Sequence, residues 1–116
     1  MTRRGWSHIN LVTPNLDRTR EFYTGVLGFE EIRCDTIDFE EGGRIRHAFF
    51  DTGQNQLLAF AEPHGLPGVP EEFDAGLNRI LGMPDGLVHF AFEAGSPEPE
   101  RPPARICLRD ARHLRR

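Results

Sequence analysis

Residues 8–29 read HINLVTPNLDRTREFYTGVLGF, and this segment indicates a strand followed by a helix. Across residues 6–12 apolar and polar side chains alternate, which is typical of a half-buried strand. Ile9 and Leu11 fall on the apolar side of this strand. The residues on its polar side are His8 and Asn10.

The next segment predicts a helix over residues 17–27. Pro14 ends the strand, and either Asn15 or Asp17 can cap the helix N-terminus. Gly28 follows at the position where a helix C-terminus favours glycine. The side chains that recur at helical spacing, where packing is the default role, are Leu16, Thr19, Phe22, Tyr23, Val26 and Leu27.

Three further strands are predicted over residues 29–35, 44–51 and 56–62. The acidic segment 38–43 between the first two ends in a Gly-Gly turn, and residues 52–55 form a short hairpin turn. The predicted order is therefore strand, helix and three strands.

The second half of the chain is less regular. Residues 63–70 form a loop with three prolines and two glycines. Residues 71–81 have one apolar helical face, although Gly76 weakens a helix there. After a turn at 82–86, residues 87–93 alternate as a strand.

The chain contains a short internal repeat. Residues 6–11 read WSHINL and residues 87–92 read LVHFAF, so each predicted strand carries histidine at its third position. If each strand opens a βαβββ module and the two modules pair their sheets, His8 and His89 would face each other across a cup.

The motifs HINLV (8–12), NLDRTREFY (15–23) and VLGF (26–29) resemble the opening of the glyoxalase/bleomycin-resistance/dioxygenase superfamily, also called the vicinal oxygen chelate group. LLAFAEP at 57–63 and VHFAFE at 88–93 are similar to that family's fourth strand and to the start of its second module. The resemblance covers about residues 5–95. It implies an α+β fold with one βαβββ module and an incomplete second module.

The implied organisation is a single domain over residues 1–116. Its first module spans 1–63, a linker with a short helix spans 64–86, and a partial second module with a basic tail spans 87–116.

The resemblance also implies a divalent metal held by one histidine from each module and a glutamate from a late strand. Such a metal binds two oxygens of a substrate and stabilises developing negative charge as a Lewis acid. His8 and His89 match the two histidines. Imidazole and carboxylate ligands suit Fe²⁺, Mn²⁺, Zn²⁺ or Ni²⁺. Each histidine could instead make a structural hydrogen bond in a polar cavity.

Glu62 is the candidate third ligand. The family's first-module glutamate aligns with Ala59, and Glu62 stands three residues later. An odd offset along a regular strand places a side chain on the opposite face, so Glu62 would reach the metal only through a bulge. The alternative is a solvated strand end before Pro63.

The second module departs from the family pattern. Residues 105–110 resemble its seventh strand, but residues 95–103 stand where a helix and a strand belong, and residues 112–116 replace the final strand. A missing covering layer would leave Phe90 and Phe92 partly exposed, which favours homodimer formation or poor solubility.

Composition and charge argue against several classes of protein. The net charge of -4 argues against nucleic acid as a partner, although residues 101–116 carry six Arg and one Asp. Cys34 and Cys107 are isolated, so they form no disulfide framework. We expect neither a signal peptide nor a membrane span, and the expected setting is cytoplasmic.

Three functions follow as hypotheses. The first is a metal-dependent lyase, isomerase or dioxygenase-type protein acting on a small oxygenated organic molecule. The second is a non-catalytic module that binds a small molecule between subunits, as in the bleomycin-resistance branch. The third is an inactive remnant. His47 could line the cup as an acid or base, and Arg44 and Arg46 could hold an anionic substrate. A surface or structural role is the alternative for all three residues.

Overall fold

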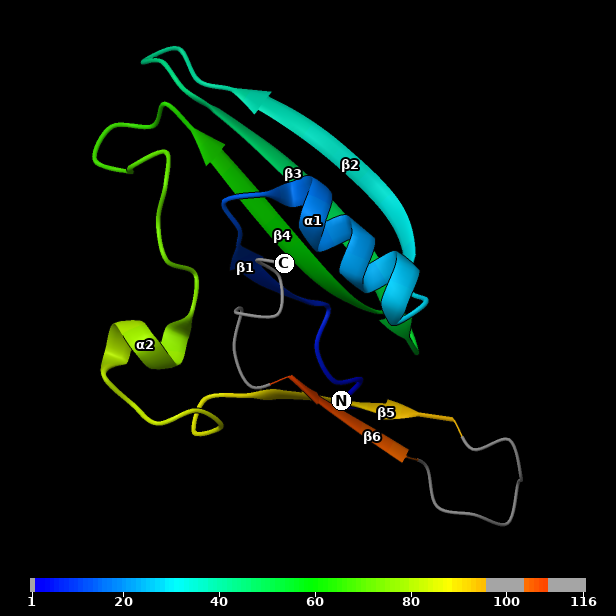
Figure 1. Cartoon of the computed structure of the whole chain (residues 1–116). Helices are drawn as coiled ribbons and strands as arrows, with labels where there is room; N and C mark the ends of the chain where they lie inside the picture. Colours follow the sequence, from blue (N-terminus) through cyan, green and yellow to red (C-terminus); the bar gives the residue numbers. More distant parts are fainter. Residues whose placement is uncertain (1, 96–103, 109–116) are drawn as a thin grey trace. The chain divides into compact units, whose positions relative to one another are not determined.

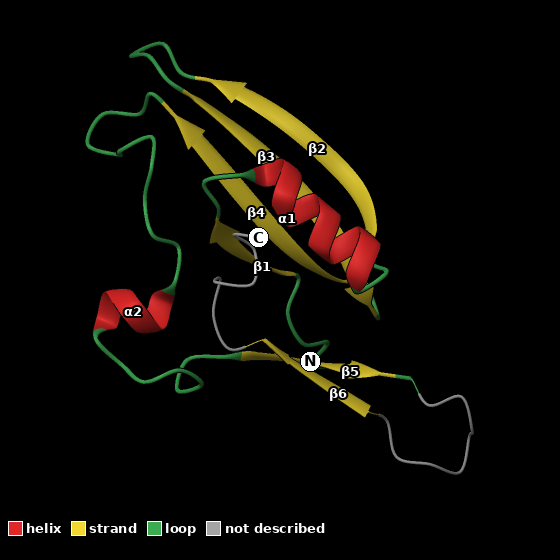
Figure 2. Cartoon of the chain, viewed as in Figure 1, coloured by secondary structure: helices red, strands yellow, loops and turns green. Residues whose placement is uncertain are grey.

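The computed structural model describes residues 2–95 and 104–108, the latter as backbone. Contacts divide the chain into two compact units, Met1–Phe73 and Asp74–Arg115. The first unit contains a strand, a helix and three strands in that order, and the second contains a short helix and two strands (Figures 1 and 2). The predicted α+β class, with a βαβββ module at the start, is confirmed.

The first unit is a four-stranded sheet with the order β1-β4-β3-β2. β1 runs parallel to β4, and the other two pairs are antiparallel. The elements of this unit are β1 (His8–Val12), α1 (Leu16–Arg20), η1 (Glu21–Val26), β2 (Glu30–Asp38), β3 (Arg44–Gly53) and β4 (Gln56–His64).

One face of the sheet packs against α1 and η1, as Figure 1 shows. Tyr23 of η1 is buried and its ring centroid lies 4.9 Å from that of Phe60 and 5.9 Å from that of Phe50. Aromatic pairs at these separations add to the free energy gained by burying their area. This face, which we call the helix face, carries the core of the first unit.

The helical segment spans residues 16–26, within one residue of the predicted 17–27 at each end, and its geometry is not uniform. Asn15, and not Asp17, caps its N-terminus, since the Asn15 Oδ1 accepts from the Arg18 backbone N at 3.1 Å. From Glu21 onward the helix widens to a π-helix, in which the Leu27 N donates to the Phe22 carbonyl at 3.0 Å. Gly28 then ends it with φ of +75°.

Both predicted turns of the first unit are present. Gln54 and Asn55 have φ of +52° and +62°, as a two-residue hairpin turn requires, and they connect β3 to β4. Between β2 and β3 the Phe39 N donates to the Gly43 carbonyl at 3.0 Å.

The second unit contains α2 (Leu77–Leu81), β5 (Phe90–Ala94) and β6 (Ala104–Leu108), and β5 pairs with β6 antiparallel. The strand predicted at 105–110 is present as β6 up to residue 108. The expectations for residues 96–103 and 109–116, including the basic tail, fall outside the described residues.

Two predicted boundaries in the second unit are wrong. The helix begins at Leu77 and not at residue 71, because the Asp74 carboxylate accepts from the Gly76 N at 2.7 Å and pairs with Arg79, turning the chain before the helix. The strand begins at Phe90, so His89 lies just before it. In the part of the chain that the structure describes, no helix has the length and apolar character needed to cross a membrane.

Candidate functional site

The sheet face opposite α1 gathers most of the candidate residues of the first unit. Because Phe50 and Phe60 point toward the helix, their neighbours along β3 and β4 point the other way. The strand register extends this face, which we call the open face, to all four strands. Its residues include His8, Asn10, Val12, Arg33, Asp35, Ile37, Ile45, His47, Phe49, Leu57, Ala59 and Ala61.

A group of rings and one amide lies across the open face. The Nε2 of His47 donates to the Asn10 Oδ1 at 2.6 Å. The ring centroid of Phe49 lies 4.4 Å from that of His47 and 6.0 Å from that of His8. The guanidinium carbon of Arg33 lies 6.0 Å from the Phe49 ring centroid. Aromatic and imidazole rings therefore form a patch shared by β1 and β3.

The charges around this patch are nearly balanced. Arg33 pairs with Asp35 at 2.6 Å on the exposed edge strand β2. Burial lowers the pKa of His47 below its usual value, His8 and Arg33 lower that pKa further, and Asp35 opposes the shift. The imidazole of His47 is therefore neutral at pH 7.

Among the residues that the structure describes, none places a carboxylate at the centre of the open face, beside Ala59. Ala59 of β4 is fully buried there and lies between its neighbours Asn10 and Phe49 in the register. Ala59 is the position that aligns with the expected fourth-strand glutamate, and its methyl group cannot bind a metal.

Glu62 lies on the helix face. It pairs with Arg46 in a regular part of the β3–β4 ladder, so no bulge turns it toward the open face. Its carboxylate is 4% exposed and accepts a short hydrogen bond from the Leu16 backbone N at the start of α1. It also contacts the Arg46 Nη1 at 3.2 Å and the His64 Nε2 at 2.6 Å. The carboxylate of Glu62 therefore already has three hydrogen-bond partners, Leu16, Arg46 and His64.

His64 connects this buried carboxylate to the following loop. Its Nδ1 lies 3.0 Å from the Glu71 Oε2, and the Glu71 Oε1 accepts from the Gly65 N at 2.6 Å. The hydrogen bonds that His64 donates to Glu62 and, second, to Glu71 raise the pKa of His64 above its usual value. The hydrogen bonds from His64 and Gly65 lower the pKa of Glu71. Residues 62–71 are thus held to the sheet by a charged network.

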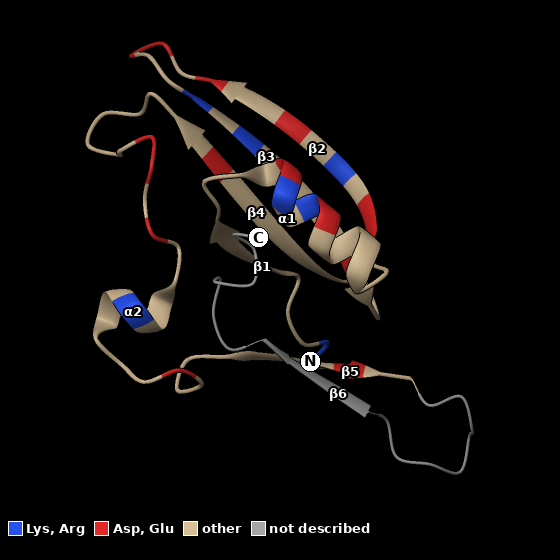
Figure 3. Cartoon of the chain, viewed as in Figure 1, with Lys and Arg blue, Asp and Glu red and all other residues tan. Residues whose placement is uncertain are grey.

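Arg44 and Arg46 also lie on the helix face, because the strand register pairs them with His64 and Glu62 of β4. Figure 3 shows the basic segments of β3 between acidic segments of β2 and β4. With His64 they line an open depression of about 430 Å³ beside the β2–β3 turn. Arg44 pairs with Asp38 at 2.8 Å, and Arg46 pairs with Glu62 and with Asp17. Their register places both arginines on the face opposite His47. That they hold an anionic substrate stays a prediction.

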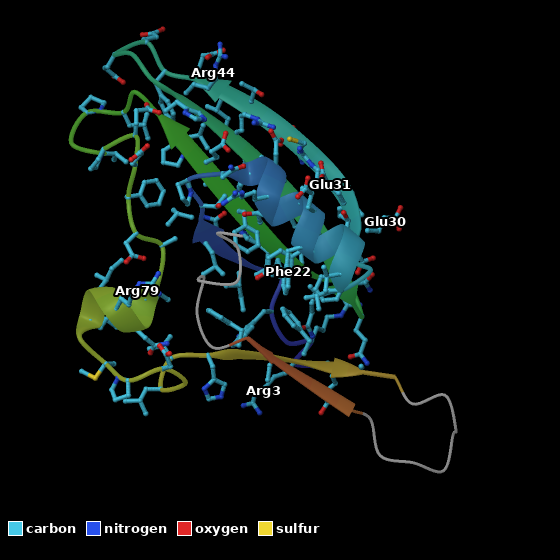
Figure 4. All side chains as sticks on the ribbon, in the orientation of Figure 1. Arg3, Phe22, Glu30, Glu31, Arg44 and Arg79 are labelled. Carbon is cyan, nitrogen blue, oxygen red and sulfur yellow. The ribbon has the colours of Figure 1, made fainter. Side chains whose placement is uncertain are left out.

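Other charged residues act as supports of the fold. Glu31 of β2, labelled beside α1 in Figure 4, forms an ion pair with Arg20 of α1. Arg79 of α2, also labelled there, pairs with Asp74 at 2.7 Å. These contacts hold the two helices in place.

His89 belongs to the second unit. It is exposed, and its Nδ1 lies 2.8 Å from the Gly86 carbonyl oxygen. His8 is exposed as well, and its Nδ1 lies 3.1 Å from the Ser7 Oγ. Neither histidine is buried in a packed core, so both imidazoles keep access to solvent.

The donor set does not fit a metal centre with three protein ligands. Within residues 2–95 and the backbone of 104–108, the structure brings together no group of three or more His, Cys, Asp or Glu residues that could hold a metal ion. Glu62 is engaged on the helix face, and Ala59 stands at the fourth-strand position. The predicted ligand set of His8, His89 and Glu62 therefore needs a different third donor.

The order of the strands and the helix agrees with the βαβββ module expected from the sequence. The model of the Glyoxalase/Bleomycin resistance protein/Dioxygenase superfamily matches residues 5–98 of the chain. The chain belongs to this superfamily. No curated protein and no solved structure gives a significant match. As a member of the glyoxalase superfamily, the chain has its first-module fold complete and departs from the expected pattern at the fourth-strand ligand.

Sequence reasoning did not find the His47–Asn10 pair of this glyoxalase superfamily member. The two residues are 37 positions apart and come from strands separated by β4. Their alternation patterns place both on one face, but only the strand order shows that they meet.

Proposed function

We propose that this protein binds a small organic molecule on the open face of its first sheet. The observation that carries the proposal is the patch formed by His8, His47, Phe49 and Asn10, where rings and one amide meet above the small side chain of Ala59. Ligand sites combine aromatic walls with a few polar groups that orient the ligand, and this patch supplies both.

A single sheet supplies only one wall of such a site. The second wall comes, in this proposal, from a second copy of the chain, so that the binding form is a homodimer. The membership in a superfamily whose members bind small molecules and often form dimers supports this arrangement. A cytoplasmic location remains part of the proposal.

The binding test uses phenol as a probe and protein kept in a strong chelator, so that no metal contributes. We expect phenol to shift the backbone amide resonances of β1, β3 and β4. Phe49→Ala should weaken phenol binding by about 3–10-fold, because it removes an aromatic contact. Val26→Ala, at an exposed helix position, is the matched control and should bind like the original chain. Shifts confined to other surfaces would contradict the proposal.

A second candidate is a metal-dependent lyase, isomerase or dioxygenase-type activity on a small oxygenated molecule. It is favoured by one observation, the exposed position of His8 on the open face. His8 and His89 would bind Fe²⁺, Mn²⁺, Zn²⁺ or Ni²⁺, and ligands other than these two histidines would fill the remaining coordination positions of the metal. The open positions of such a metal would polarise substrate oxygens.

Metal uptake separates the two candidates. Equilibrium dialysis against Zn²⁺ and Mn²⁺ should show weak, substoichiometric uptake if the small-molecule proposal holds. Stoichiometric uptake that is lost in both His8→Ala and His89→Ala would support the metal-dependent candidate instead. His64→Gln serves as the control because His64 lies on the helix face. A chain that takes up neither metal nor phenol would be an inactive remnant.

A further inference from the structure

His47 is held in one orientation by a contact that spans a whole strand. Asn10 lies on β1 and His47 on β3, while their register partners on the intervening β4 are Ala59 and Ala61. Strands separated by one neighbour lie about 10 Å apart, so two long polar side chains meet only where the middle strand carries small residues. The two alanines therefore make the 2.6 Å hydrogen bond between Asn10 and His47 possible.

This hydrogen bond selects one tautomer of His47. The Asn10 Oδ1 is an amide oxygen and only accepts, so the Nε2 of His47 carries the proton. In a neutral imidazole the other nitrogen, Nδ1, then carries a lone pair. Within the described residues no group donates a hydrogen bond to this Nδ1. The open face thus presents one defined hydrogen-bond acceptor, the Nδ1 of His47, because Asn10 keeps the proton on Nε2.

The surroundings keep this imidazole neutral. The charged and titratable groups that act on His47 are His8 from β1 and Arg33 and Asp35 from β2, while β4 contributes only alanines at this point. Burial is the largest influence and lowers the pKa of His47. Its Nδ1 therefore remains a lone-pair acceptor at pH 7 and is not occupied by a proton.

We propose that the Nδ1 of His47 accepts a hydrogen bond from a hydroxyl or N–H group of the bound molecule, and that Asn10 is the positioning residue that fixes this acceptor. The inference rests on the proposed function and deepens it. The site then selects molecules that present a donor beside a flat apolar surface, because the Phe49 ring lies next to His47. An ether of the same shape offers no donor and leaves the acceptor unpaired.

The test compares phenol with anisole, which differ in the hydroxyl donor. Binding is measured by NMR titration of the metal-free protein. The original chain should prefer phenol by about 3–10-fold, the range of one net hydrogen bond. His47→Phe keeps a ring but removes the acceptor, and it should bind both probes equally. His64→Gln, on the helix face, should keep the preference for phenol.

A second readout isolates the role of Asn10. The ¹⁵N shifts of the His47 ring should show a protonated Nε2 in the original chain and a mixture of tautomers in Asn10→Ala. Asn10→Ala should also reduce the preference for phenol, whereas a merely structural role would leave both the tautomer and the preference unchanged.

The outcomes distinguish the inference from the proposed function. Equal binding of phenol and anisole to the original chain would overturn the role of His47 while the open face remains the binding site. A protonated Nδ1 in place of Nε2 would overturn it as well. Absence of binding by both probes would contradict the proposed function and this inference together.

Discussion

At the level of single residues, Glu62 shows how a carboxylate that matches a metal-site motif takes a structural role. A buried carboxylate is stable only when charges and hydrogen bonds compensate the loss of water. Glu62 receives this compensation from the Leu16 N, from Arg46 and from His64. It also lies at the N-terminus of α1, where the helix dipole stabilises negative charge.

The first prediction concerns the removal of this carboxylate. Glu62→Ala should lower the free energy of unfolding by about 1–3 kcal/mol, because it leaves buried donors without an acceptor. Glu62→Gln should lose less, since its amide oxygen still accepts one hydrogen bond. Urea unfolding measures both variants, with the exposed Glu72→Gln as control. Glu62→Ala with unchanged stability but reduced metal uptake would restore Glu62 as a metal ligand.

The second prediction concerns pH and His64. Because its pKa is raised from 6.5 in the folded state, its stabilising contribution is complete below about pH 6.5. This contribution is lost as the pH rises through the folded pKa. The lowered pKa of Glu71 acts in the opposite sense, and its contribution is lost as the pH falls below about 4.5.

The melting temperature of the first unit should therefore be highest between these two limits and fall as the pH rises toward 8. His64→Gln should flatten the decrease on the alkaline side. His8→Gln, which replaces a histidine on the open face, should leave this decrease in melting temperature unchanged. A decrease of equal size in the His64 variant would show that another group titrates.

At the level of elements, α2 is held by the side-chain amide of Asn78, which makes two hydrogen bonds to the backbone of one residue, Val88. The fully buried Asn78 donates from Nδ2 to the Val88 carbonyl at 3.0 Å and accepts from the Val88 N at 2.9 Å. A helix of five residues has too few internal hydrogen bonds to be stable alone. This double contact connects it to the segment before β5.

The third prediction follows from that contact. Asn78→Ala should speed hydrogen exchange at the Val88 amide by about 5–150-fold, equivalent to the 1–3 kcal/mol cost of leaving buried partners unsatisfied. Asn78→Asp keeps the acceptor for the Val88 N and should show a smaller change. Exchange at the Phe60 amide in the first unit should stay the same in both variants. Unchanged exchange at Val88 would contradict the role assigned to Asn78.

At the level of the whole molecule, the second unit exposes several large apolar side chains. Exposed apolar patches of this kind favour association between chains. The exposed residues of α2 and the turn after it are Leu77, Ile80, Leu81, Met83 and Leu87, of which Leu87 is 62% exposed.

The fourth prediction is that the chain associates with itself through this surface. Sedimentation velocity should show a mass that rises with protein concentration. Ile80→Glu should shift the distribution toward the monomer, because it places a charge in the patch. Val26→Glu, an exposed site on the first unit, should leave the distribution unchanged. A concentration-independent monomer would rule out this association.

The amino-acid sequence alone determined the features that depend on neighbours along the chain. Alternation identified the strands of the first unit, and glycine at position 28 marked the end of the helix. Helical spacing predicted a helix over residues 17–27, which the structure has at 16–26. The HINLV and VLGF motifs also identified the superfamily. These features are local, because side-chain periodicity and backbone preference act within a few residues.

The tertiary structure alone decided which side chains meet. The order β1-β4-β3-β2 brings Asn10 to His47 across two alanines, and the packing of α1 places its N-terminus on Glu62. In the second unit, Asp74 and Arg79 shorten the predicted helix. Partners across strands depend on chain topology and on burial, and local periodicity carries no information about either.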